Sequence, residues 1–182
     1  PAPVEHSALP GEAVTLPFAP PLGTELRYDI TVTKKSKETK VQRLEQTVRF
    51  DKSSDGFLMR VKTIGGFLPG TDSVRINWEN NDAIPAFLRP LVEPMVVELN
   101  ANGEIVRMRD WPRIRDGFAA MAEPMSAFIE PDPAKRPAIR KMLDNIAGLF
   151  SRMSAEDAPH LLLKGWPVAL GFGGQDYVLD QK

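Results

Sequence analysis

The chain has 182 residues, of which 42% are hydrophobic and 26% are charged, and its formal net charge is -1. This balance is typical of a globular domain and excludes wholesale disorder, collagen and low-complexity fibres. The chain has no cysteine, which excludes disulfides, zinc fingers, thiol catalysis and iron–sulfur ligation, and its nearly neutral charge provides no basic field for nucleic acid.

The first 22 residues predict an extended lead-in. Six prolines occur in residues 1–22, too closely spaced for a helix or a central strand. The expected anchors of this lead-in are Val14, Leu16 and Phe18. A single domain is expected over residues 23–182. Such tethers are common in exported bacterial proteins, and the chain begins with proline, as after cleavage of a signal or at a cloning boundary. We therefore expect a periplasmic or otherwise exported protein.

Alternation of apolar and polar residues predicts an antiparallel meander after the lead-in. The first strand is expected over about Glu25–Thr33, the second over about Val41–Asp51, and the third over Phe57–Thr63. The polar segments Lys34–Lys40 and Asp51–Gly56 are short enough to connect these strands as tight turns.

A shorter strand and a second hairpin are expected next. The strand lies around Val74–Trp78, and the prolines in residues 79–94 limit any helix there to a turn or two. The hairpin joins Met95–Leu99 to Glu104–Arg109, and Gly103 supplies the positive φ that its turn requires.

Apolar residues at spacings of three and four predict two long helices in the second half of the chain. The first begins after Asp110, the expected N-cap, and Pro124 is expected to kink it. The second runs from about Pro133 to Arg152, and Ser154–Asp157 has the capping-box form that begins a third, short helix. The two apolar stripes consist of Trp111, Ile114, Phe118, Met121, Met125 and Phe128, and of Ile139, Met142, Leu143, Ile146, Leu149, Phe150 and Met153.

The order of strands, then helices, then a final strand-like segment predicts an α+β fold. We expect a curved antiparallel sheet, a half-barrel, with two to three helices packed on its concave face and sheltering both stripes. The last residues, 175–182, have the pattern of a strand whose partner is expected to lie outside this chain.

Few residues suggest catalysis. Asp157 and His160 lie three residues apart and could meet on a helix, with Ser154 nearby, which leaves a catalytic triad as one alternative. The capping box explains Ser154 and Asp157 without catalysis, and His6 lies in the lead-in. Residues 171–174 match no phosphate-binding fingerprint. We predict no catalytic residue, no metal site and no cofactor.

Four lysines gather in residues 34–40. They could contact an acidic membrane surface or partner, or form a solvated hairpin end that discourages edge pairing. We favour the solvated end because the rest of the chain is expected to add no basic patch.

The methionines and aromatic residues near the predicted sheet and helix faces form a soft interior that could accept an apolar ligand. Packing alone explains most of them. The candidate lining residues are Tyr28, Phe57, Trp78, Met95, Trp111, Phe118 and Met121.

Two short segments carry a resemblance to a known family. They are the entry segment Gly23–Tyr28 and the hairpin Val97–Val106, in which Asn-x-x-Gly connects two strands. With the meander and the following helices, the layout resembles the LolA and LppX type of half-barrel carriers of the bacterial envelope, together with uncharacterised exported relatives. The likeness covers the order of elements over about residues 22–180. It implies a half-barrel fold and a lipid or lipoprotein cargo, and it carries no residue role over to this chain.

We therefore expect an exported, non-enzymatic binding protein with an apolar groove for a lipid or another hydrophobic ligand, and no membrane-spanning segment. An alternative is a structural or protein-interaction module of a bacterial envelope complex, docking through its final strand. A third alternative is an enzyme that uses Asp157 and His160.

Overall fold

The computed structural model describes most of the chain: residues 13–34, 40–67, 75–79, 84–163, 166, 170 and 176–178. Several sequence predictions concern residues outside these ranges: the first part of the lead-in with His6, the tip of the lysine-rich turn at 35–39, and the glycine-containing stretch at 171–174.

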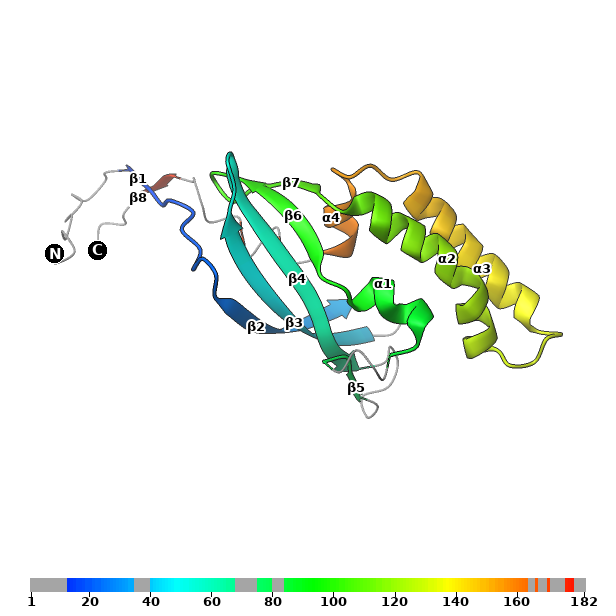
Figure 1. Ribbon diagram of the computed structural model, residues 1–182. Helices are drawn as coiled ribbons and strands as arrows, with labels where there is room; N and C mark the ends of the chain where they lie inside the picture. The colour runs from blue at the N-terminus through cyan, green and yellow to red at the C-terminus, as the bar shows by residue number, and fades with distance from the viewer. Residues whose placement is uncertain are drawn as a thin grey trace.

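An open antiparallel sheet forms one layer of the molecule (Figure 1). Its strand order is β2-β3-β4-β6-β7, and a short β5 pairs with the end of β4. The strands are β2 (Glu25–Lys34), β3 (Lys40–Lys52), β4 (Gly56–Phe67), β5 (Arg75–Asn77), β6 (Met95–Asn100) and β7 (Ile105–Met108). The sheet is curved, and a register shift between Glu45 and Gln46 of β3 marks a β-bulge of the kind that bends a strand.

Apolar side chains in register cover one face of the sheet. Val48 of β3 lies opposite Val61, Met59 opposite Val97, and Val97 opposite Met108. All five are almost fully buried. Because side chains alternate between the faces of a strand, the intervening positions place charged residues on the other face.

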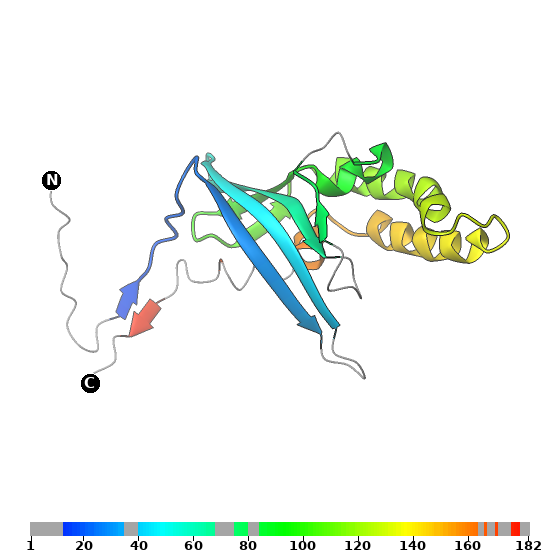
Figure 2. The same ribbon diagram turned by 90° about the horizontal axis from the view of Figure 1, so that it is seen from below.

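The helices follow the sheet in the chain. They are η2 (Ala86–Leu88), α1 (Arg89–Val92), α2 (Trp111–Ile129), α3 (Arg136–Ser151) and α4 (Ala158–Leu162). α2 and α3 form an antiparallel hairpin that projects beyond the sheet, while α4 lies beside β7, where the Met108 N–H donates to the Ala155 carbonyl at 2.8 Å (Figures 1 and 2). The predicted α+β class, with a curved antiparallel sheet and helices packed against it, is confirmed.

The core joins the sheet to the near ends of the helical hairpin. Trp111 begins α2, Phe150 lies near the end of α3, and both are buried with the apolar face of the sheet. The indole N–H of Trp111 donates to the Met153 carbonyl at 2.9 Å, which ties the start of α2 to the residues after α3. Trp166 and Leu170 complete this core from the C-terminal part of the chain.

The expectation that the sheet shelters both helical stripes was wrong for one face of α3 and for the end of α2. Phe128 of α2 is 63% exposed, and Met142, Ile146 and Leu149 of α3 are 48%, 42% and 51% exposed. Another face of α3, which contains Phe150, packs against α2 and the core, so Met142, Ile146 and Leu149 are left outside these contacts. The end of α2 lies in the part of the hairpin that extends past the sheet (Figure 2).

Two details of the predicted helix starts can be compared with the structure. Asp110 makes no capping hydrogen bond to α2, and its carboxylate instead accepts from the Val96 N–H at 3.2 Å and from Arg113. The Ser154 hydroxyl accepts from the Asp157 N–H at 3.1 Å, as expected of the first half of a capping box.

The C-terminal strand has its partner within the chain, so the expectation of an outside partner was wrong. Strand β8 (Asp176–Val178) pairs antiparallel with β1 (Ala13–Thr15) of the lead-in. Of the expected anchors of the lead-in, Phe18 packs edge-on against Phe57, with ring centroids 5.2 Å apart, whereas Leu16 is exposed. Gly103 has the predicted positive φ, at 85°.

Candidate functional site

Four of the seven residues that the sequence suggested for ligand binding belong to the packed core. Phe57 and Trp111 are buried, and Met95 and Phe118 are half-buried against the same cluster. Phe118 stacks on Phe150 of α3, with ring centroids 4.2 Å apart and an interplanar angle of 22°. Packing between the sheet and the hairpin therefore accounts for these four side chains.

The other three residues lie around that core. Tyr28 of β2 is partly exposed and meets the buried Trp166 edge-on, with ring centroids 5.0 Å apart. Met121 is buried in α2. Trp78 follows β5 and is half-buried, and its backbone N–H donates to the Ile64 carbonyl at 2.8 Å. The seven side chains thus spread across the core and its margins.

The largest apolar feature on the described surface of the helices lies on α3. Met142, Ile146 and Leu149 recur at spacings of four and three, so they form one row along the helix, here called the α3 row. Each is at least 42% exposed. At the far end of the hairpin, Phe128 and Ile129 of α2 are also exposed.

The α3 row was not foreseen as surface, although its signal is visible in the sequence. The apolar arc of α3 contains a second row, with Ile139 and Leu143 half-buried and Phe150 buried. α2 packs on the side of α3 that carries this second row, where Phe118 stacks on Phe150. α2 is the only long helix that packs on α3 within the described ranges.

Basic residues accompany the α3 row. Between residues 135 and 152 there are five basic residues and one acidic residue, Asp144, whereas the whole chain has a formal net charge of -1. Lys141 and Arg152, here called the basic flank, are exposed on the side of the row that faces away from α2. The net charge of each half of the chain does not reveal this local grouping of two exposed basic side chains.

The remaining charges of the hairpin are largely paired. Arg140 donates to Asp144 at 2.8 Å and also bonds Glu123 of α2, and the hydrogen bond to Asp144 raises the pKa of this guanidinium. Lys141 has no ion-pair partner among the described residues. Its ammonium group is therefore available to an anionic group near the α3 row.

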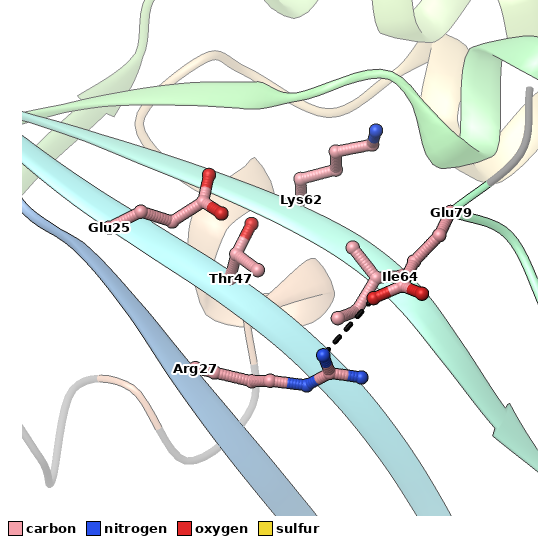
Figure 3. A pocket seen from close by; sticks show the side chains of 6 residues that line it. All are labelled: Glu25, Arg27, Thr47, Lys62, Ile64 and Glu79. Carbon is pink, nitrogen blue, oxygen red and sulfur yellow. Dashed lines mark ion pairs between the residues drawn. The ribbon is translucent and has the colours of Figure 1, made fainter.

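A small hollow of about 220 Å³ lies on the charged face of the sheet (Figure 3). Arg27 bridges two carboxylates there, those of Glu79 and Glu45, both at 3.1 Å. The residues that line this hollow are Glu25, Arg27, Thr47, Lys62, Ile64 and Glu79. Two acidic and two basic side chains balance, so the hollow favours neither an anion nor a cation.

A larger open hollow, of about 580 Å³, lies between the β3–β4 turn, β6, β7 and Glu156. Arg107 donates to the Glu98 carboxylate at 2.7 Å, and this hydrogen bond raises the pKa of the guanidinium. Arg109 lies 3.9 Å from the same carboxylate. The guanidinium groups of Arg107 and Arg109 in this hollow thus both pair with Glu98.

The catalytic alternative has little geometric support. The Asp157 carboxylate accepts from the Ser154 hydroxyl at 2.8 Å, so this pair forms a turn before α4. His160 is exposed on α4. Across the described ranges, no three histidine or acidic side chains converge as a metal site requires.

No helix in the described part of the chain is long and apolar enough to cross a membrane. Comparison of the chain with protein-family models, with curated proteins and with solved structures finds no match.

Proposed function

We propose that this is an exported, non-enzymatic binding protein that holds a hydrophobic ligand, such as an acyl chain, on the α2–α3 hairpin. The observation that carries the proposal is the α3 row, in which three large apolar side chains are 42–51% exposed. Contiguous apolar surface of this kind marks interaction sites more often than scattered exposed residues do.

The surroundings of the row suit an amphiphile. From Met142 to Leu149 the row extends about 10 Å along the helix axis, at about 1.5 Å per residue. The basic flank places Lys141 and Arg152 beside it. An acyl chain could lie on the row while its anionic head group meets the basic flank.

This proposal retains the function expected from the sequence and moves its site. The groove was expected to be lined by residues such as Phe57 and Trp111, which are instead buried in the core. The resemblance to half-barrel envelope carriers agrees with an apolar cargo and with an exported location, and both belong to the proposal.

Methionine methyl groups provide a direct test. Met142 is 48% exposed in the α3 row, whereas Met108 is 1% exposed in the core. Protein labelled with ¹³C at the methionine methyls is titrated with lauric acid below its micellar concentration and followed by NMR. We expect the Met142 signal to shift to saturation while the Met108 signal stays in place.

Two variants control this titration. Ile146→Gln removes an apolar side chain from the row and should weaken binding about fivefold, because a ligand can bury at most the 42% of Ile146 that is exposed. Val106→Gln changes a similarly exposed residue, 46%, on β7 and should bind like the wild type. The proposal is wrong if Met142 does not shift at saturating lauric acid, or if the two variants bind equally.

A further inference from the structure

We infer that α3 docks on an anionic lipid bilayer, with the α3 row entering the interface and the basic flank meeting the head groups. The inference rests on the proposed function, because it names the physical source of the hydrophobic groups that the row binds. It goes beyond the proposed function by naming a membrane surface as the partner that covers the α3 row.

The shape of the molecule leaves the row accessible to a flat surface. The far part of the α2–α3 hairpin projects past the sheet in both views (Figures 1 and 2). Phe128 and Ile129 are also exposed near the end of α2, where the Phe128 ring lies 5.7 Å from the ring of Phe87, centroid to centroid. A bilayer could therefore reach the hairpin without displacing the core.

The composition of α3 is that of an interfacial helix. Such helices divide strongly into an apolar and a polar face, are not very apolar when all their residues are taken together, and have lysine or arginine on the polar side. α3 has this division, whereas α2 is more apolar overall and less strongly divided. The difference agrees with α2 packing inside the molecule and α3 facing outward.

The basic residues beside the α3 row favour an anionic bilayer over an uncharged apolar partner. The segment from Lys135 to Arg152 contains five basic residues and one acidic residue. Lys135 pairs with Asp132, and Arg140 pairs with Asp144 and Glu123, which leaves the basic flank as the positive charge beside the row. The only acidic residue of α3, Asp144, is bound to Arg140 on the side away from the row. Each basic side chain held near an anionic leaflet strengthens binding about fivefold.

Acidic residues at the end of the hairpin are held within the connection between the helices. The Glu130 carboxylate accepts from the Asp132 N–H at 3.1 Å, and Asp132 pairs with Lys135 at 3.4 Å. Asp132 therefore opposes the approach of an anionic surface less than a free carboxylate would, whereas Glu130 keeps its charge.

Vesicle co-sedimentation of the full chain tests the inference. Vesicles of phosphatidylcholine alone are compared with vesicles that also contain phosphatidylglycerol, at low and at high salt. We expect binding to the mixed vesicles only, weakened by salt because the charges are exposed.

Matched variants identify the surface. Lys141→Gln and Ile146→Gln should each lower the partition coefficient for mixed vesicles about fivefold. Lys62→Gln, on the charged face of the sheet, and Val106→Gln, on β7, should bind like the wild type. All four positions are at least partly exposed, so the variants are expected to fold.

Three results would overturn the inference. The first is that the wild type does not bind mixed vesicles. The second is that the variants and their controls lose binding to mixed vesicles equally. The third is a dimer in native mass spectrometry that Ile146→Gln dissociates, because the occupant of the row would then be a second copy of the chain. The lauric acid titration separates the two proposals. If Met142 shifts with lauric acid while mixed vesicles do not bind, the bilayer is excluded and the binding function stands.

Discussion

The most informative test of the fold is to remove one hydrogen bond that connects the C-terminal part of the chain to the sheet. The Trp166 indole N–H donates to Gln46 Oε1 at 3.0 Å, and Gln46 Nε2 donates to Thr63 Oγ1 at 3.1 Å. All three residues are buried. In Trp166→Phe, Gln46 Oε1 keeps no donor among the described residues.

The expected cost has two parts. A buried acceptor left without a donor costs about 1–3 kcal/mol. The smaller ring adds about 1 kcal/mol of lost packing. Together, about 3 kcal/mol corresponds to a fall in Tm of about 6–12 °C for a chain of this length.

A double-mutant cycle isolates the hydrogen bond from the packing. Gln46→Met alone leaves the indole N–H unpaired, whereas Gln46→Met with Trp166→Phe replaces both polar groups with apolar ones. The double variant should therefore be more stable than the sum of the single losses predicts, by about 1–2 kcal/mol. Urea unfolding followed by circular dichroism measures all four free energies of unfolding.

Trp78→Phe provides the control, since Trp78 is only half-buried and no side-chain hydrogen bond to it is described. It should cost less than Trp166→Phe. If the two variants are equally stable, or if the cycle shows no coupling, Trp166 does not fasten the C-terminal part of the chain to the sheet.

Three further variants test local features. Gly56→Ala should destabilise the protein by about 2 kcal/mol or more in urea unfolding, because a Cβ there would lie 2.1 Å from the Leu99 carbonyl oxygen. Gly148→Ala, inside α3 with no close neighbour for the new methyl, should stabilise it by about 0.5–1 kcal/mol in the same assay. The hydrogen bond from Arg60 lowers the pKa of Asp51, so Arg60→Gln should move this pKa up toward the ordinary range of an aspartate in an NMR titration. Because the folded pKa is the lower one, the stability that ionised Asp51 contributes is present above the unfolded pKa and is lost as the pH falls through the folded value.

Much of the secondary structure could be predicted because its causes are local. The strand expected over residues 25–33 is β2, Glu25–Lys34, and the second long helix expected over about 133–152 is α3, Arg136–Ser151. Alternation with period two and recurrence at three and four positions act within one segment. Gly103 was predictable for the same reason, since a compact turn requires a positive φ.

Contacts between distant segments could not be predicted in this way. The pairing of β1 with β8 joins residues from opposite ends of the chain, and neither segment differs in pattern from other short apolar stretches. The bond between Trp166 and Gln46 spans 120 positions. Alternation places Gln46 on the apolar face with Val48 and Phe50, but it does not indicate which distant residue binds the side-chain amide.

In the candidate site too, local pattern was predictable and contacts between distant segments were not. Helical spacing marks Phe118 and Met142 alike as members of apolar stripes, yet Phe118 stacks on Phe150 while Met142 is exposed. Which member of a stripe is covered depends on where the neighbouring helix and sheet lie. The expected lining residues were therefore mostly core residues, and the surface row was assigned to the interior.

The proposed binding role predicts that folding does not require the exposed α3 row. A side chain that stays about half-exposed contributes little to the free energy of unfolding, and a polar residue in its place usually changes stability by less than about 0.5 kcal/mol. Ile146→Gln and Leu149→Gln should therefore unfold in urea like the wild type, while Phe150→Ala, a change in the buried row of the same helix, should cost about 3–5 kcal/mol. If Ile146→Gln instead destabilises the protein as much as Phe150→Ala does, the row serves the core, and its apolar character needs no ligand to explain it.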